Sequence, residues 1–143
     1  MNKYIDEILD LADQAFKEKE IPVGAIIVYE DNIIGRGYNK RVQTNDVTSH
    51  AEVNAIREAA TQLNDWRLDR CDLYVTLKPC DMCMNIIKES RIKNVYYLVD
   101  RNSDKKIYNK TLVRDIIEGD KIDVIKSNYL DKLSDFFKTN GMR

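Results

Sequence analysis

The sequence has little cysteine, proline or glycine: its 143 residues include three cysteines, two prolines, five glycines and a single histidine. Three cysteines do not make a disulfide framework, and the chain has no low-complexity tract or internal repeat. With 24 Asp+Glu against 23 Lys+Arg, no overall charge attracts the chain to nucleic acid or to an anionic membrane. No apolar run approaches the roughly 20 residues that span a bilayer, and the first residues lack the apolar core of a signal sequence. We therefore expect one soluble, cytoplasmic domain, residues 1–143, that does not associate with membranes.

Apolar residues recur at helical spacing in several segments, and short β-rich runs lie between them. The pattern predicts, in order, a helix over 4–16, a hairpin of strands 25–29 and 33–38, a site-forming loop over 39–48, a helix over 49–63, a strand over 73–77, a helix over 80–90 and a strand over 92–99. A short helix over 112–117, an edge strand over 122–125 and a final helix through 130–137 complete the order. This alternation predicts an α/β fold with a parallel or mixed sheet covered by helices.

Two cysteines and the histidine form the first candidate site. Cys80 and Cys83 are three residues apart at the start of a predicted helix, so they lie on one face, where the helix dipole favours the thiolates that bind metal. His50 opens another predicted helix and completes a Cys₂His set, which leaves the fourth tetrahedral position of Zn²⁺ to water. Three protein ligands are typical of catalytic zinc. We expect one Zn²⁺ per chain, bound by His50, Cys80 and Cys83.

Glu52 is the candidate proton-transfer residue. It follows His50 by two residues, about 200° around a helix, so a regular helix does not bring both side chains to one metal. A carboxylate beside a zinc-activated water can take the water's proton and later deliver protons to a leaving group. A simpler interpretation exists, because residues 49–52 match a capping box, with Thr48 or Ser49 as the helix N-cap. Glu52 is therefore either a catalytic acid and base or a helix cap.

The cysteines also have alternative interpretations. The Cys80 and Cys83 pair could be a redox dithiol, although Pro79 precedes it where a thioredoxin-like site has an aromatic residue. A redox pair leaves His50 without a role. Cys71 is expected to be a small buried hydrophobe that takes no part in the site.

The motif His50-Ala51-Glu52, followed by Pro79-Cys80-Asp81-Met82-Cys83, resembles the signature of zinc-dependent nucleobase deaminases. Further segments are similar to the bacterial tRNA adenosine deaminases over about residues 3–100: Ile21-Pro22-Val23-Gly24-Ala25, Gly37-Tyr38-Asn39, Trp66-Arg67-Leu68, Leu73-Tyr74-Val75-Thr76-Leu77 and Ser90-Arg91-Ile92. The resemblance implies a cytidine deaminase-like three-layer α-β-α sandwich, with a central five-stranded mixed sheet and helices on both faces. It also implies a homodimer.

The resemblance assigns roles to individual residues. It implies that His50, Cys80 and Cys83 bind zinc and that Glu52 transfers protons. It also implies that Asn39 hydrogen-bonds the target base and that the backbone of Ala51 faces this base.

The chain departs from the family pattern at two places, and both concern the substrate. Lys78 stands where the tRNA deaminases usually have glutamate, and residues 100–106 contain no glycine, whereas the family loop that approaches the RNA is glycine-rich. The segment 79–83 also resembles fungal-type cytosine deaminase, and residues 45–46 with 50–53 resemble bacterial guanine deaminase.

We expect a zinc-dependent hydrolytic nucleobase deaminase that converts adenosine to inosine at the wobble position of tRNA, with the anticodon loop as its partner. The alternative is an enzyme for a free nucleobase or nucleoside, such as cytosine or guanine. A non-catalytic zinc-binding subunit is a third hypothesis, and the intact Glu52 argues against it. For an RNA substrate, basic residues could form one rim if the loop after Asp100 and the last helix meet near the site: Lys40, Arg41, Lys105, Lys106, Lys110, Lys132, Lys138 and Arg143.

Overall fold

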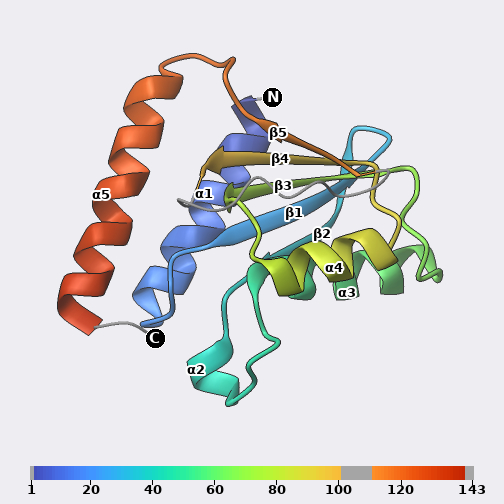
Figure 1. The fold of residues 1–143 in the computed structure, drawn as a ribbon, viewed down its shortest axis with the longest axis horizontal. Coiled ribbons are helices and arrows are strands. Elements are labelled where there is room, and N and C mark those ends of the chain that lie inside the picture. The colour runs from blue at the N-terminus through green and yellow to red at the C-terminus, as the bar shows by residue number, and fades with distance from the viewer. Residues whose placement is uncertain (1, 101–110, 141–143) are drawn as a thin grey trace.

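The computed structural model describes residues 2–100 and 111–140, which form a sheet flanked by helices (Figure 1). The elements are α1 (Asn2–Lys17), β1 (Gly24–Tyr29), β2 (Asn32–Tyr38), α2 (Arg41–Thr44), α3 (Ala51–Leu63), β3 (Cys71–Leu77), α4 (Asp81–Glu89), β4 (Asn94–Val99), β5 (Leu112–Asp115) and α5 (Ile122–Asn140). The sheet order is β2-β1-β3-β4-β5. β1 is antiparallel to β2 and β3, whereas β3, β4 and β5 are parallel. The predicted five-stranded mixed sheet is confirmed.

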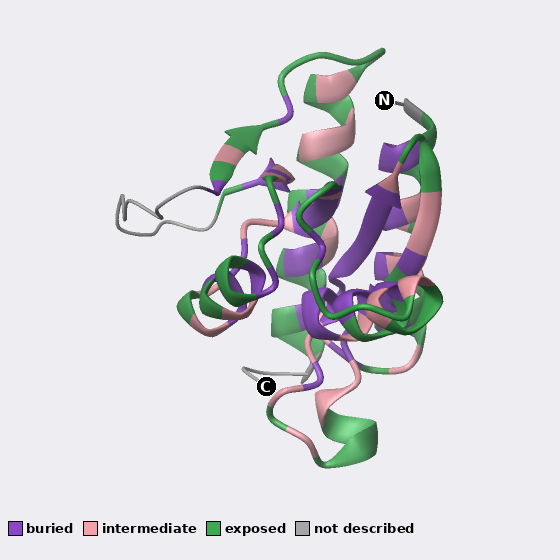
Figure 2. Cartoon of the chain, turned by 90° about the vertical axis from the view of Figure 1, so that its right-hand side faces the viewer, coloured by how far each residue is buried: buried purple, intermediate pink, exposed green. Residues whose placement is uncertain are grey.

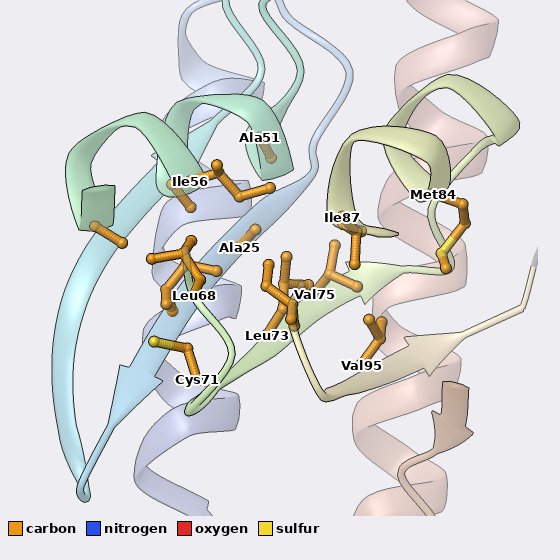
Figure 3. Close-up of a cluster of buried hydrophobic side chains, with 14 of the residues drawn as sticks. Ala25, Ala51, Ile56, Leu68, Cys71, Leu73, Val75, Met84, Ile87 and Val95 are labelled. Atoms are coloured by element: carbon orange, nitrogen blue, oxygen red, sulfur yellow. The ribbon is translucent and has the colours of Figure 1, made fainter. Parts of the chain in front are cut away.

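Helices cover both faces of this sheet, as the α-β-α prediction requires. On one face, Leu73 and Val75 of β3 pack in the main buried cluster with residues of α3 and α4 (Figure 3). On the other face, Tyr74 packs against α1, and the inner residues of α5 pack against α1 and β4. Alternate residues of a strand enter different layers, which explains why the middle of β3, residues 73–75, is continuously apolar. The central strands β1 and β3 are therefore largely buried, whereas the edge strand β5 and the helix α2 are mostly exposed (Figure 2).

β2 and α3 approach each other closely because glycine lies between them. A Cβ atom added at Gly37 would lie 2.3 Å from the Ala51 carbonyl oxygen and 2.5 Å from the Ala55 nitrogen. A Cβ atom at Gly35 would lie 2.2 Å from the Ala55 carbonyl oxygen. The close packing brings the first turn of α3 beside the end of β2, where the site-forming segment begins.

The C-terminal part differs from the prediction. Residues 112–115 form the edge strand β5, not a helix, and residues 122–125 are the first turn of α5, not a strand. The strand forms because Leu112 and Val113 pair with Asn94 and Val95 of β4. The helix forms because its apolar positions continue at helical spacing into the buried α5 residues. No helix among the described residues is long and apolar enough to cross a membrane.

Candidate zinc centre and active site

The predicted metal ligands meet where two helices begin. His50 is the N-cap of α3, Cys80 is the N-cap of α4, and Cys83 lies in the first turn of α4. His50 Nδ1 lies 3.8 Å from Cys80 Sγ and 3.4 Å from Cys83 Sγ, and the ligand atoms of all three lie within 4.8 Å of one another. Tetrahedral zinc with usual bond lengths holds N and S ligand atoms about 3.6 Å apart. The three side chains therefore have the dimensions of a Cys₂His zinc site.

The pKa values of the two thiols are shifted in opposite directions. The Cys83 side chain, followed by His50, lowers the pKa of Cys80 through hydrogen bonding, against the effect of burial. The hydrogen bond with Cys80, then burial and the charge of Glu52, raise the pKa of Cys83 above its usual range. A coordinating cation would remove this difference in pKa, because both thiols would then be held as thiolates. Thiolate and imidazole donors suit zinc better than magnesium or calcium.

Glu52 lies beside the ligands and outside the ligand set. It is in the first turn of α3 and is 3% exposed. The capping-box interpretation is wrong, because the N-cap is His50, not Thr48 or Ser49. The carboxylate acts on Cys83 by hydrogen bonding and by charge, which places it against the metal site. A buried carboxylate in this position can accept and return a proton.

Asn39 and Ala51, which the family resemblance singled out, lie in contact. Asn39 is 5% exposed, and its Oδ1 accepts the Ala51 N–H at 2.8 Å. The N–H of Asn39 donates to the Val23 carbonyl at 3.3 Å. Ala51 lies between His50 and Glu52, so Asn39 fixes the helix turn that carries them. The Ala51 N–H is thereby occupied, and the Asn39 side-chain N–H₂ is the donor that can serve a bound base.

Comparison with known families agrees with this geometry. A family profile described as the cytidine and deoxycytidylate deaminase zinc-binding region matches residues 1–99, more than half of the 143 residues. The match contains the ligand trio, Glu52 and Asn39. The chain belongs to this deaminase family.

Relatives of this chain have named activities. The tRNA-specific adenosine deaminase of Buchnera aphidicola subsp. Schizaphis graminum is 45% identical over 89 residues, which cover 62% of this chain and 59% of that protein. The chain therefore matches less than two thirds of that relative's length. One similar structure comes from work on A-to-I editing by tRNA:A34 deaminases at the wobble position of transfer RNA. It is 32% identical, with a TM-score of 0.74, and the match covers 80% of this chain and 97% of that one. Guanine deaminase from Bacillus subtilis is 38% identical, with a TM-score of 0.66. This match covers 69% of this chain and 64% of that one.

Glu20 is a buried residue near the candidate site that the sequence pattern did not reveal. It is 1% exposed, and its carboxylate accepts the N–H of Val42 at 3.0 Å and that of Gln43 at 2.9 Å. It thereby holds α2 beside Asn39, and both residues line a cavity of about 290 Å³. In the sequence, Glu20 is one of several charged residues that follow the amphipathic helix α1. The apolar segment 21–24 that follows Glu20 is the one local indication that the chain enters the core at this point.

Cys71 is a buried hydrophobe, as predicted. It is fully buried among apolar residues on the face under α3 and α4 (Figure 3). Burial raises the pKa of its thiol to about 11. Its burial in the apolar cluster leaves the other two cysteines as the pair that contacts His50.

Lys78, where the tRNA deaminases usually have glutamate, joins the ends of two parallel strands. Its Nζ lies 3.9 Å from Asp100 Oδ1 and 5.5 Å from the centre of the Tyr97 ring. The lysine is thus engaged within the protein, two residues before the first cysteine ligand. The glycine-free loop that follows Asp100 lies outside the described residues.

The predicted basic rim is only partly supported. Lys132 forms an ion pair with Asp13 and lies over the Phe16 ring, so it joins α5 to α1 on the face opposite α3 and α4. Its assignment to a rim beside the site is wrong. Lys40 and Arg41 do lie next to Asn39. Residues 105, 106, 110 and 143 are outside the described residues.

Proposed function

We propose that the chain is a zinc-dependent hydrolytic deaminase that converts adenosine to inosine at the wobble position of tRNA. The observation that carries the proposal is the Cys₂His ligand set with the buried Glu52 carboxylate against it. The reaction adds water and releases ammonia. The relatives named as tRNA-specific adenosine deaminases support this choice of substrate.

His50, Cys80 and Cys83 would hold one Zn²⁺ per chain. When bound, zinc makes a water molecule acidic enough to act as a nucleophile near neutral pH. Glu52 would take one proton from the attacking water and pass it to the adenine ring nitrogen as the oxygen adds to C6. Glu52 would then take the second proton, from the added hydroxyl, and pass it to the amine, which leaves as ammonia while the C6 oxygen becomes the carbonyl of inosine. Two protons taken and two delivered return the carboxylate to its starting state. A non-catalytic subunit would not need a buried carboxylate at this place.

The base would be held by the segment that follows β2. Asn39 donates its side-chain N–H₂ to the base, while its Oδ1 keeps Ala51 and the first turn of α3 in place. In a tRNA, the wobble base must leave its loop to enter the site, and Lys40 and Arg41 would contact flanking phosphates. We further propose that the enzyme is cytoplasmic, since free cysteines suit a reducing compartment, and that it is a homodimer, as the family resemblance implies.

The test presents RNA and free bases to the same preparation. Zinc-loaded protein is incubated with total tRNA from cells that lack a wobble deaminase and, separately, with adenine, cytosine and guanine and their nucleosides. Inosine in tRNA and ammonia release are measured, with a Glu52→Gln preparation as the control. Inosine at the wobble position, without free-base turnover, supports the proposal. Robust guanine or cytosine deamination without inosine in tRNA would establish the alternative, and inactivity on every substrate would indicate a non-catalytic zinc protein.

A further inference from the structure

Tyr129 of α5 places its hydroxyl group in the interior of the protein. Tyr129 is 2% exposed, and its hydroxyl donates to the Pro22 carbonyl at 2.7 Å. It also accepts a hydrogen bond from the hydroxyl of Thr76, at 3.0 Å. The Thr76 hydroxyl in turn accepts the N–H of Gly24 at 3.2 Å. Two buried hydroxyls therefore hold both ends of residues 22–24, the short segment that leads into β1.

The same segment holds the base-binding side of the site. The carbonyl of Val23, between the two anchored residues, accepts the N–H of Asn39, and Asn39 Oδ1 accepts the N–H of Ala51. Hydrogen bonds thus connect Tyr129, on the face opposite α3, with the first turn of α3. This series of hydrogen bonds runs from Tyr129 through the segment 22–24 and Asn39 to Ala51.

We propose that Tyr129 is a positioning residue for the substrate base. It fixes segment 22–24, and through Val23 it fixes the backbone of Asn39 relative to α3. Pro22 has no N–H, so its carbonyl is the polar group by which the backbone can be held at that residue. An unpaired buried carbonyl or hydroxyl is costly, so removal of the Tyr129 hydroxyl favours rearrangement of the segment. The catalytic part of this inference rests on the proposed deaminase function.

The test compares Tyr129→Phe with a matched control, Tyr4→Phe. Tyr4 is also buried, at 6% exposed, and its hydroxyl donates to a backbone carbonyl, that of Asp31, at 3.2 Å. That bond lies at the β1–β2 turn, away from Asn39. Both variants lose one hydroxyl and one bond to the backbone, and Tyr129→Phe also loses the bond from the Thr76 hydroxyl. A merely structural role for Tyr129 predicts a general loss of stability in both variants, with no change confined to Asn39 and Ala51.

The first readout is amide hydrogen exchange, which needs no substrate. In Tyr129→Phe we expect the Asn39 and Ala51 amides to exchange about fivefold faster, the equivalent of one hydrogen bond. In Tyr4→Phe these two amides should exchange at the wild-type rate. Thr76→Val, which removes the other hydroxyl, should reproduce the Tyr129→Phe pattern. Unchanged exchange of both amides in Tyr129→Phe would overturn the inference even if the protein proves inactive on tRNA.

The second readout is turnover on the tRNA substrate. We expect kcat/KM to fall about fivefold in Tyr129→Phe, with full zinc content, and to stay at the wild-type value in Tyr4→Phe. If Tyr129 acts through Asn39, the double variant Tyr129→Phe/Asn39→Ala should be no slower than Asn39→Ala alone. Additive losses in the double variant would contradict that route. An equal loss in Tyr4→Phe would show that general stability, not positioning, is responsible.

Discussion

Replacement of Glu52 by glutamine tests proton transfer separately from metal binding and packing. The amide has nearly the same size as the carboxylate and can still accept a hydrogen bond, but it cannot take a proton from water. Glu52 is 3% exposed and is not a metal ligand in the proposed set. The change should therefore leave the zinc ligands and the packing around α3 in place.

The expected magnitudes follow from the position of Glu52 in α3. Loss of a general acid and base costs about 10² to 10⁴-fold in turnover, which is about 3–5 kcal/mol of activation free energy. Because His50 is the N-cap, no side-chain cap is lost. The stability change is that of removing one negative charge from a helix N-terminus, about 0.3–1 kcal/mol.

The assay measures three quantities on one preparation: zinc per chain by metal analysis, the midpoint of thermal unfolding, and inosine formed per minute. We expect full zinc, a small shift of the midpoint, and a turnover at least a hundredfold lower. An active Glu52→Gln protein with full zinc would refute proton transfer by this residue. Loss of zinc along with activity would instead make Glu52 part of the metal site.

Further variants test the surroundings of the site. Cys83→Ser should lose zinc and stability, since metal binding is coupled to folding; metal analysis checks this, and full occupancy would contradict the ligand assignment. Cys71→Ala should cost about 1–2 kcal/mol in denaturant unfolding and leave the zinc content unchanged. Gly37→Ala should cost about 1–3 kcal/mol and lower turnover, because its Cβ meets the Ala51 carbonyl at 2.3 Å. Glu20→Gln should remove one of the two acceptors that hold α2, because the amide N–H₂ cannot accept a backbone N–H, and should raise KM severalfold with kcat less affected. Zinc occupancy should fall as the pH is lowered, since protons compete for the thiolates and the imidazole.

Local patterns were enough to predict most of the fold and the three residues that come together in the candidate metal site. The spacing of Cys80 and Cys83 at a helix start and the position of His50 at another depend on short segments, and the structure has all three at helix N-termini. Strands buried on both faces were recognisable from their continuous apolar runs. The prediction failed at residues 112–125, where short apolar groups fit a strand or a helix equally well and pairing with β4 decides.

The parts that could not be predicted depend on contacts between distant segments. Glu20 is recognisable as a buried anchor only when α2 is placed over it. The bond from Tyr129 to Pro22 joins residues 107 positions apart, and no periodicity in either segment indicates it. The pairing of Lys78 with Asp100 likewise depends on β3 and β4 lying side by side.

The hydrolytic deaminase assignment is tested most directly by isotope transfer. An anticodon stem-loop RNA with adenosine at the wobble position is incubated with the zinc-loaded protein in H₂¹⁸O, and the nucleosides are then analysed by mass spectrometry. Our account predicts inosine with one ¹⁸O atom at C6, together with one ammonia per inosine, and neither product with Glu52→Gln. Absence of inosine, or inosine without the label, would contradict it.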